Sequence, residues 1–189
     1  MTCDEASMPD DDSVVRAALE RVDDFAPLYE RYAMAIYRYC FNQVRDPDVA
    51  NDLTAQVFVR AIERLHQYRP RHGATFRSWL FTIARNIVID QWRRYRPTRA
   101  IEGVLDIIRS DDPGPEEIAV HRSQMADVRH AVERLPDRYR DIVWLRLAGL
   151  TTTEIALALN ITEPAMKSAQ TRAYKQLRDI LEPGKGGEK

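Results

Sequence analysis

Residues 151–181 read TTTEIALALNITEPAMKSAQTRAYKQLRDIL, a pattern typical of a helix-turn-helix. A threonine among residues 151–153 can cap the short first helix, because its hydroxyl accepts a hydrogen bond from an otherwise unpaired amide. Asn160 falls at the turn, where asparagine tolerates a left-handed backbone, and we expect Ile161 to fill the space between the helices. The second helix is predicted to begin near Glu163-Pro164, since proline suits a first helical position.

The second helix is expected to present a polar outer surface, because its apolar positions recur at helical spacing and would face inward. Basic and amide side chains in the N-terminal half of such a helix can enter the major groove and bond to bases and phosphates. A plain helical hairpin with a solvated charged face would show the same pattern. The side chains predicted to contact duplex DNA are Lys167, Ser168, Gln170, Thr171, Arg172 and Lys175.

Helical spacing extends over most of the 189 residues, with no alternation of period two. Gly149 suits the end of a preceding helix, because glycine adopts the left-handed turn there without steric cost. The predicted fold is all-α, with two small helical domains of which the second is a four-helix domain containing the helix-turn-helix. Its predicted parts are a disordered acidic tail at 1–13, a first domain at 14–97, an acidic flexible linker at 98–117, the second domain at 118–183 and a tail at 184–189.

Two helices of the first domain carry clear apolar stripes. One is expected to begin at Pro47 and to end before the loop at 68–73, and the next to follow this loop and stop near Pro97. The expected inward faces are Val49, Leu53, Val57 or Phe58, Ala61 and Leu65 on one helix, and Phe76, Leu80, Ile83, Ile87 and Gln91 or Trp92 on the other.

The net charge of −1 hides blocks of opposite sign along the chain. Residues 1–24 hold eight acids and two bases (−6), and residues 100–133 hold eight acids and three bases (−5). Residues 60–99 hold ten arginines and two acids (+8), and residues 134–180 hold eight bases and five acids (+3). The blocks indicate two polyanion-binding segments with an acidic connector between them. Arginines that merely solvate helix faces are the ordinary alternative.

Residues 76–96 interleave aromatic and basic side chains on one predicted helix. Aromatic rings can stack on unpaired bases while arginines neutralise phosphates, which is the chemistry of single-strand binding. The same aromatic residues could instead be core. They are Phe76, Trp79, Phe81 and Trp92.

Four stretches, in order, resemble the extracytoplasmic-function (ECF) sigma factors of the sigma-70 family. They are DLTAQVF (52–58), WLFTIARN (79–86), LPDRYR (135–140) and the segment from GLT (149–151) through KS (167–168), within residues 20–181. The resemblance implies a subunit that binds core RNA polymerase and directs promoter-specific transcription initiation without catalysis. It would read the minus-35 element as duplex and the minus-ten element as melted single strand.

The resemblance also implies roles for single residues. Asp52, Leu53 and Gln56 would dock on the clamp of the largest polymerase subunit, while the second domain would rest on the flap of the second largest. Lys167 and Arg172 would read the minus-35 element, and Tyr68 and Asn86 an unpaired minus-ten base. The full minus-ten set is Tyr68, Arg77, Arg85, Asn86, Arg93 and Arg94. An anti-sigma factor is the implied regulator.

Two departures from the family pattern affect these assignments. The usual Gln-Glu pair of the clamp-binding helix is Ala55-Gln56 here, which implies a weaker or shifted core contact. Ala169 stands where the recognition helix usually has an arginine, so one phosphate or base contact is missing.

The sequence is also compatible with other classes of protein. A helix-turn-helix regulator acting without polymerase would need no basic aromatic helix at 76–96, and an adaptor would bind polymerase but not promoter DNA. The sequence shows no nucleophile constellation, no paired carboxylates and no metal-ligand spacing, so we expect no enzyme, metal or cofactor. The short apolar runs and acidic N-terminus predict a cytoplasmic protein without membrane insertion.

Overall fold

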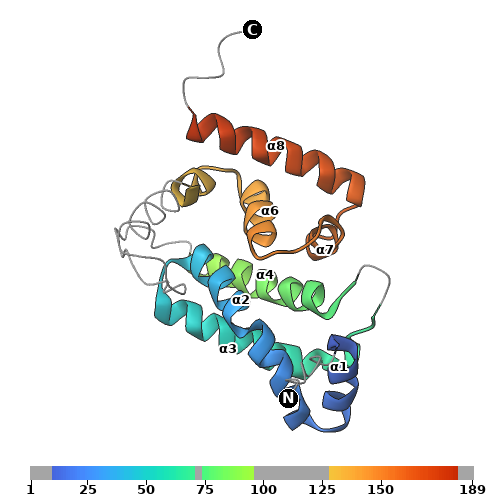
Figure 1. Ribbon diagram of the computed structural model, residues 1–189. Coiled ribbons are helices and arrows are strands. Elements are labelled where there is room, and N and C mark those ends of the chain that lie inside the picture. The colour runs from blue at the N-terminus through green and yellow to red at the C-terminus, as the bar shows by residue number, and fades with distance from the viewer. Residues whose placement is uncertain (1–9, 71–73, 96–127, 183–189) are drawn as a thin grey trace, which may run out of the picture. The chain divides into compact units, whose positions relative to one another are not determined.

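The computed structural model describes residues 10–70, 74–95 and 128–182. Every regular element in these ranges is a helix, which confirms the all-α prediction (Figure 1). The chain folds as two compact units, one formed mainly by the residues before residue 100 and one mainly by those after it. The predicted linker at 98–117, the tail at 184–189 and most of the predicted tail at 1–13 lie outside the described residues.

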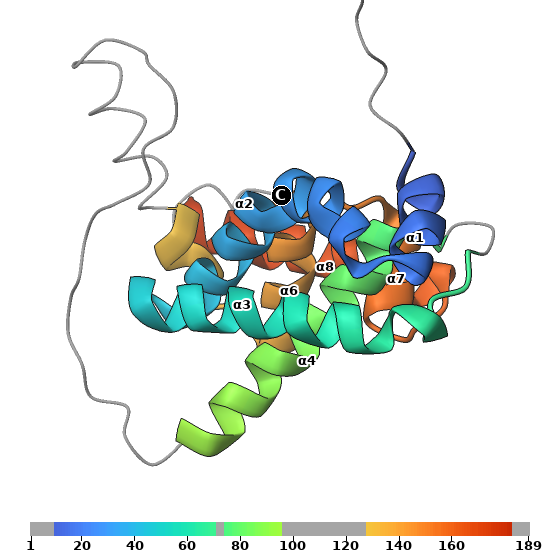
Figure 2. The same ribbon diagram turned by 90° about the horizontal axis from the view of Figure 1, so that it is seen from below.

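The N-terminal unit is a bundle in which three long helices pack on one another, with a shorter helix beside them (Figures 1 and 2). Its elements are α1 (Asp11–Glu20), the 3₁₀ turn η1 (Val22–Phe25), α2 (Ala26–Val44), α3 (Pro47–Arg64), the 3₁₀ turn η2 (Leu65–Gln67) and α4 (Phe76–Tyr95). The short helix α1 contacts η1, α2 and η2.

Local sequence signals explain where these helices begin. Asp46 accepts hydrogen bonds from the amides of Asp48 (2.9 Å) and Val49 (3.0 Å), so α3 starts at Pro47 as predicted. Arg45 has a left-handed backbone (φ 62°) that ends α2 just before this cap. The two helices are therefore joined by a tight turn.

The start of α1 corrects the predicted disorder of residues 10–13. Asp10 caps α1 by accepting a hydrogen bond from the amide of Ser13 (2.7 Å), so the helix begins at Asp11 rather than near Val14. Acidic residues are favoured in a first turn, because their charge complements the helix dipole. The three aspartates that suggested a disordered tail are thus a helix start.

The core of the N-terminal unit largely follows the predicted stripes. Leu53, Val57, Phe58, Ala61 and Leu65 of the α3 segment are buried, and so are Phe76, Leu80 and Ile83 of α4. Farther along α4 the buried residue is Val88, whereas Ile87 is only half-buried. The stripe therefore shifts by one position in the last half of the helix.

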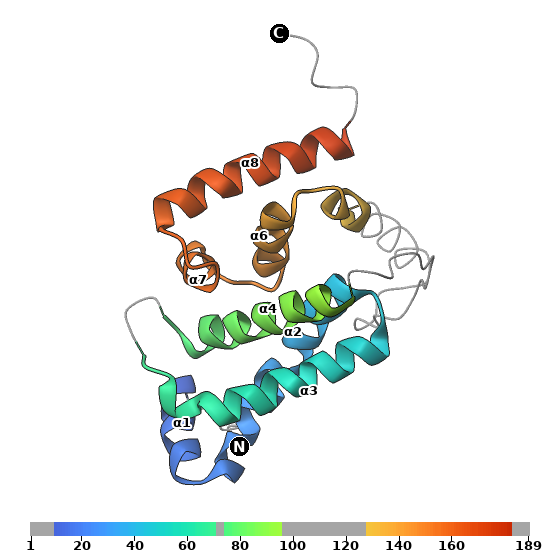
Figure 3. The ribbon, with the colours of Figure 1, turned by 180° about the vertical axis from the view of Figure 1, so that it is seen from behind.

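The C-terminal unit is the predicted helix-turn-helix domain, in which α6 packs against the long helix α8 (Figure 3). A helical segment at 128–133 precedes α6 (Asp137–Leu147), α7 (Thr152–Ala158) and α8 (Glu163–Leu181). Gly149 (φ 84°) and Asn160 (φ 53°) both have the left-handed backbone that their positions predicted.

Threonine side chains cap the starts of both α7 and α8. The amide of Thr151 donates to Glu154 Oε2 (2.8 Å) and the amide of Glu154 donates to Thr151 Oγ1 (3.2 Å), a capping box that identifies Thr151 as the cap. Thr162 caps α8. Ile161 does not fill the space between the helices as expected, because it remains 39% exposed, while Met166 is fully buried.

Candidate nucleic-acid interface

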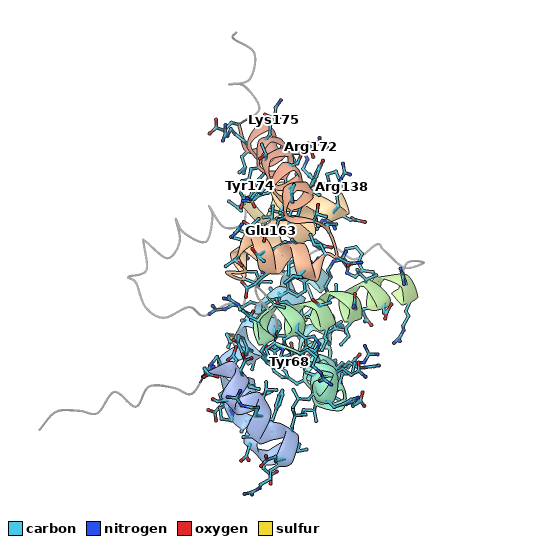
Figure 4. All side chains as sticks on the ribbon, turned by 90° about the vertical axis from the view of Figure 1, so that its right-hand side faces the viewer. Tyr68, Arg138, Glu163, Arg172, Tyr174 and Lys175 are labelled. Atoms are coloured by element: carbon cyan, nitrogen blue, oxygen red, sulfur yellow. The ribbon has the colours of Figure 1, made fainter. Side chains whose placement is uncertain are left out.

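The outer surface of α8 carries most of the predicted duplex contacts. Lys167, Ser168, Thr171, Arg172 and Lys175 are all exposed. Arg172 and Lys175 extend from α8 into solvent (Figure 4). Lys167 and Arg172 are five residues apart, which separates them by about 7.5 Å along the helix and 140° around it. They can therefore bond to different parts of a groove.

Gln170 does not belong to this surface as predicted. It is half-buried, on the side of α8 that also carries the buried Met166 and Ala173. Its Oε1 accepts a hydrogen bond from Arg146 Nη2 (3.1 Å). Gln170 therefore holds α8 within the unit instead of extending outward with its neighbours.

Arg146, at the end of α6, connects three parts of the helix-turn-helix unit. Besides Gln170, its guanidinium donates to the carbonyl oxygen of Leu150 (2.9 Å) and to Thr152 Oγ1 (2.7 Å). Guanidinium groups donate several hydrogen bonds in a fixed plane, so one arginine can orient several acceptors. Arg146 thus positions the start of α7 relative to α8.

The second predicted surface follows α4. Asn86 and Arg93 are exposed and seven residues apart, so they lie on one face of the helix, with Arg94 exposed beside them. Arg93 lies 3.6 Å from Asp90, an exposed pair that contributes little to stability. Arg77 and Arg85 are half-buried. The outer strip can hold a phosphate backbone along the last half of α4.

The aromatic residues of α4 divide between core and surface. Phe76 and Phe81 are fully buried, so the core alternative holds for them. Trp79 and Trp92 are half-buried. Of these four side chains, only the two tryptophans can therefore stack on bases.

Tyr68 is not presented to solvent, contrary to its predicted role as a base reader. Its side chain is only 4% exposed, and its ring packs against Phe76 (centroids 5.7 Å apart) and Trp79 (5.5 Å). Its hydroxyl donates a hydrogen bond to Asp12 Oδ1 (2.8 Å), in the first turn of α1.

A surface cavity of about 520 Å³ opens at this end of the N-terminal unit. Tyr68, Tyr32, Arg31, Arg16 and the Asp10–Asp12 turn contribute to its lining. Arg31 forms an ion pair with Asp11, and the Tyr32 hydroxyl donates to the same carboxylate (2.5 Å). Burial, followed by the hydrogen bonds to Asp11 and Asp12, raises the pKa of both tyrosines above its ordinary value of about 10. Both phenols therefore remain protonated donors in the alkaline range as well as at neutral pH.

The predicted polymerase-docking residues lie on α3. Asp52 and Gln56 are exposed and four residues apart, so they share one face. Leu53 was wrongly placed with them, because it is 1% exposed and belongs to the core. Val59, seven residues after Asp52, extends the same outer face and is 57% exposed.

Sequence reasoning missed Val59 and the residues around Tyr68. An apolar residue at an outward helical position is the signal that identifies Val59. The signal for Asp11 and Asp12 is the acidic cap pattern directly before the helical spacing. Arg31 and Tyr32 gave no such signal, because their partners precede them by about 20 residues.

No group of three or more His, Cys, Asp or Glu side chains that could hold a metal ion occurs within the described ranges. In the same part of the chain, no helix combines the length and apolar character needed to cross a membrane.

Comparison with known proteins relates both units to transcription factors. Residues 28–98 match the family model for sigma-70 region 2, and residues 125–177 match the model for sigma-70, region 4. The ECF RNA polymerase sigma factor SigD of Mycobacterium bovis is 33% identical over 152 residues, which cover 77% of this chain and 71% of SigD.

The ECF RNA polymerase sigma factor BldN of Streptomyces coelicolor is 34% identical over 171 residues, or 89% of this chain. The match spans only 64% of BldN. In fold, the chain is similar to the sigma factor RpoE solved with the anti-sigma factor NepR from Bartonella quintana, with a TM-score of 0.65 at 18% identity. That match covers 85% of this chain and 98% of RpoE.

Proposed function

This chain belongs to the ECF sigma factors of the sigma-70 family, and from that premise we propose that it binds core RNA polymerase and directs initiation at specific promoters. The observation that carries the proposal is the presence, in one chain, of a region 2 unit and a region 4 unit that each expose basic side chains on a single helix. A regulator acting on duplex DNA alone would need only the second of these surfaces.

The C-terminal unit would read the minus-35 element as duplex. An α-helix fits the major groove of B-DNA, where arginine can pair with a guanine edge and lysine can neutralise a phosphate. Arg172 and Lys167 are exposed on α8 and well separated around it, so each can make one of these contacts. Ser168, Thr171 and Lys175 are neighbouring exposed donors.

The N-terminal unit would hold the melted minus-ten strand along α4. Arg93 and Arg94 would bind its phosphates, and Asn86 and the half-buried Trp79 supply an amide and a ring for unpaired bases. These contacts need single-stranded DNA, which exists only where the duplex is melted. Minus-ten binding is therefore expected to depend on core polymerase.

The exposed face of α3, which carries Asp52, Gln56 and Val59, would dock on core polymerase. This face would contact the clamp of the largest subunit, and the C-terminal unit would rest on the flap of the second largest subunit. In this proposal the protein acts in the cytoplasm, where the polymerase is, by binding polymerase and DNA and without catalysing a reaction itself. Its regulator would be an anti-sigma factor, as for the structurally similar RpoE.

The test is a pull-down of purified core polymerase with the tagged full chain, followed by run-off transcription on genomic fragments. We expect stoichiometric core binding and initiation at a small set of fragments that core enzyme alone does not use. Failure to bind core, together with tight sequence-specific duplex binding by the free chain, would support a stand-alone regulator instead.

A further inference from the structure

The start of α1 accepts hydrogen bonds from two other segments of the N-terminal unit. Arg31 and Tyr32 of α2 both bond to Asp11, and Tyr68 at the end of η2 bonds to Asp12. Arg31, Tyr32 and Tyr68 are part of the cavity lining, together with the two aspartates. The acidic turn thus occupies the hydrogen-bonding groups at one wall of this cavity.

The occupied groups are of the kind that bind nucleic acid. A guanidinium and two phenols can donate to phosphate oxygens or base edges, and the cavity, at about 520 Å³, is within the size range of about 300–1,000 Å³ that is common for small-ligand pockets. Each donor that serves a carboxylate is unavailable to DNA. The negative charge of Asp10–Asp12 also opposes an approaching phosphate backbone.

α1 is a short helix with a small apolar anchor. Over its ten residues it buries Val14, Val15 and Ala18. Short segments with few buried apolar side chains open at lower free energy than the core does. The polar contacts of Asp11 and Asp12 are therefore a substantial part of what holds the turn against Tyr68.

We propose that the acidic turn Asp11-Asp12 is an internal competitor of single-stranded DNA, which covers Tyr68 in the free protein and leaves it when the melted strand binds. The proposal rests on the proposed minus-ten function of the N-terminal unit and adds a regulation of that site. In the structure Tyr68 is in a covered state, and the proposal adds an uncovered state in which its hydroxyl donates a hydrogen bond to DNA. Free protein would be kept off single strands elsewhere in the chromosome.

The experiment measures binding of the free full chain to a fluorescein-labelled, mixed-sequence 12-nucleotide single strand by anisotropy. Asp12→Asn removes the charge but keeps an oxygen that can accept from Tyr68. Tyr68→Phe removes the hydroxyl contact and keeps the ring. Glu20→Gln is the matched control, because it removes one charge from the exposed end of the same helix. Circular dichroism melts establish that each variant is folded.

We expect Asp12→Asn to strengthen binding by roughly 3- to 10-fold, through loss of a repelling charge, and Glu20→Gln to change it by less than about 2-fold. Tyr68→Phe should also bind the strand more tightly than the parent, but the gain should be smaller than for Asp12→Asn. This variant loses the hydrogen bond that holds Asp12 over the ring, but it also loses a hydroxyl that could donate to DNA. Equal effects of Asp12→Asn and Glu20→Gln would overturn the proposal, and so would parent-like affinity of both Asp12→Asn and Tyr68→Phe.

Hydrogen exchange gives an independent readout on the parent protein. The amides of α1 should exchange faster when the 12-nucleotide strand is bound, and unchanged or increased protection of α1 would contradict its displacement. Run-off transcription by the parent with core polymerase separates the two hypotheses. If the parent initiates but none of the binding changes occur, only the competitor proposal fails; if the parent does not initiate, the proposed function fails.

Discussion

Arg146 Nη2 donates a hydrogen bond to Gln170 Oε1 at 3.1 Å, linking the end of α6 to the middle of α8. A guanidinium has only donors, so the amide oxygen of Gln170 must face it. The same arginine bonds to the carbonyl oxygen of Leu150 and to Thr152 Oγ1. The orientation of α8 relative to the turn therefore depends on a residue outside both helices of the motif.

Arg146→Ala should lower the free energy of unfolding by about 1–3 kcal/mol, because it leaves part-buried acceptors without their charged donor. Thermal denaturation followed by circular dichroism measures the change. Arg178→Ala, an exposed arginine on α8, is the control and should shift stability by no more than about 0.5 kcal/mol. Gln170→Ala should destabilise in the same direction but leave the base preference at the promoter unchanged. A changed base preference in Gln170→Ala would return Gln170 to the DNA-contacting set.

Leu53→Ala should destabilise the N-terminal unit by about 2–5 kcal/mol, the usual cost of truncating a fully buried leucine. The reason is its 1% exposure in the core. Asp52→Ala, at the neighbouring exposed position, should leave stability nearly unchanged and reduce core polymerase binding. Urea denaturation of the two variants distinguishes the roles, and equal stability of Leu53→Ala and parent would show that Leu53 is not a core residue.

Gln56→Glu should strengthen binding to core polymerase, because it restores the carboxylate that the family pattern has on this face of α3. Competition between the variant and the parent for limiting core enzyme measures the effect. The change should weaken as salt is raised, since exposed charge pairs are screened over about 10 Å at 0.1 M. If Gln56→Glu binds no better at any ionic strength, the docking contact does not include this position.

The helix boundaries could be predicted from the sequence because their causes are local. Asp46-Pro47 and Glu163-Pro164 mark helix starts by capping and by the fixed backbone angle of proline, and both predictions are confirmed. The apolar spacing predicted Leu53 on the inward face of its helix, and its burial confirms this. The family resemblance placed the same residue in the docking set, which its burial contradicts.

Contacts between distant segments could not be predicted in this way. Nothing in the sequence indicates that Tyr68 bonds to a residue 56 positions earlier. Gln170 occupies the border of the inward face of α8, where spacing cannot tell a DNA contact from a partner of Arg146. Whether a side chain at such a border faces solvent or the core depends on the residues that pack beside it.

Cys40 should resist thiol reagents in the folded protein at pH 8. It is fully buried, and burial raises the pKa of its thiol to about 12, so almost none is present as the reactive thiolate. Because the folded pKa exceeds the unfolded value of about 8.5, this group favours the folded state below that pH and loses its contribution as pH rises toward 12. The rate at which a Cys3→Ser variant reacts with a chromogenic disulfide, with and without urea, measures the protection of Cys40. Rapid labelling without urea would contradict a closed core around Cys40.

Arg172→Ala and Lys167→Ala should fail in different ways at the minus-35 element. If Arg172 pairs with a guanine, its loss costs about 1–3 kcal/mol at one base position and relaxes the preference there. If Lys167 contacts phosphate, its loss weakens all promoters about equally and reduces the salt dependence by about one counterion. Run-off transcription on a promoter library, repeated at several salt concentrations, measures both effects.

Neither substitution should alter core binding, because the proposed clamp contact lies on α3 in the other unit. Lys175→Ala is a useful third variant, since Lys175 is exposed on the same helix two turns beyond Lys167 and tests how far along α8 the DNA extends. Parent-like initiation and unchanged base preference in both Arg172→Ala and Lys167→Ala would show that α8 does not read the promoter. The C-terminal unit would then act as an anchor on polymerase, and the promoter would be selected by Asn86, Arg93 and Arg94 on α4.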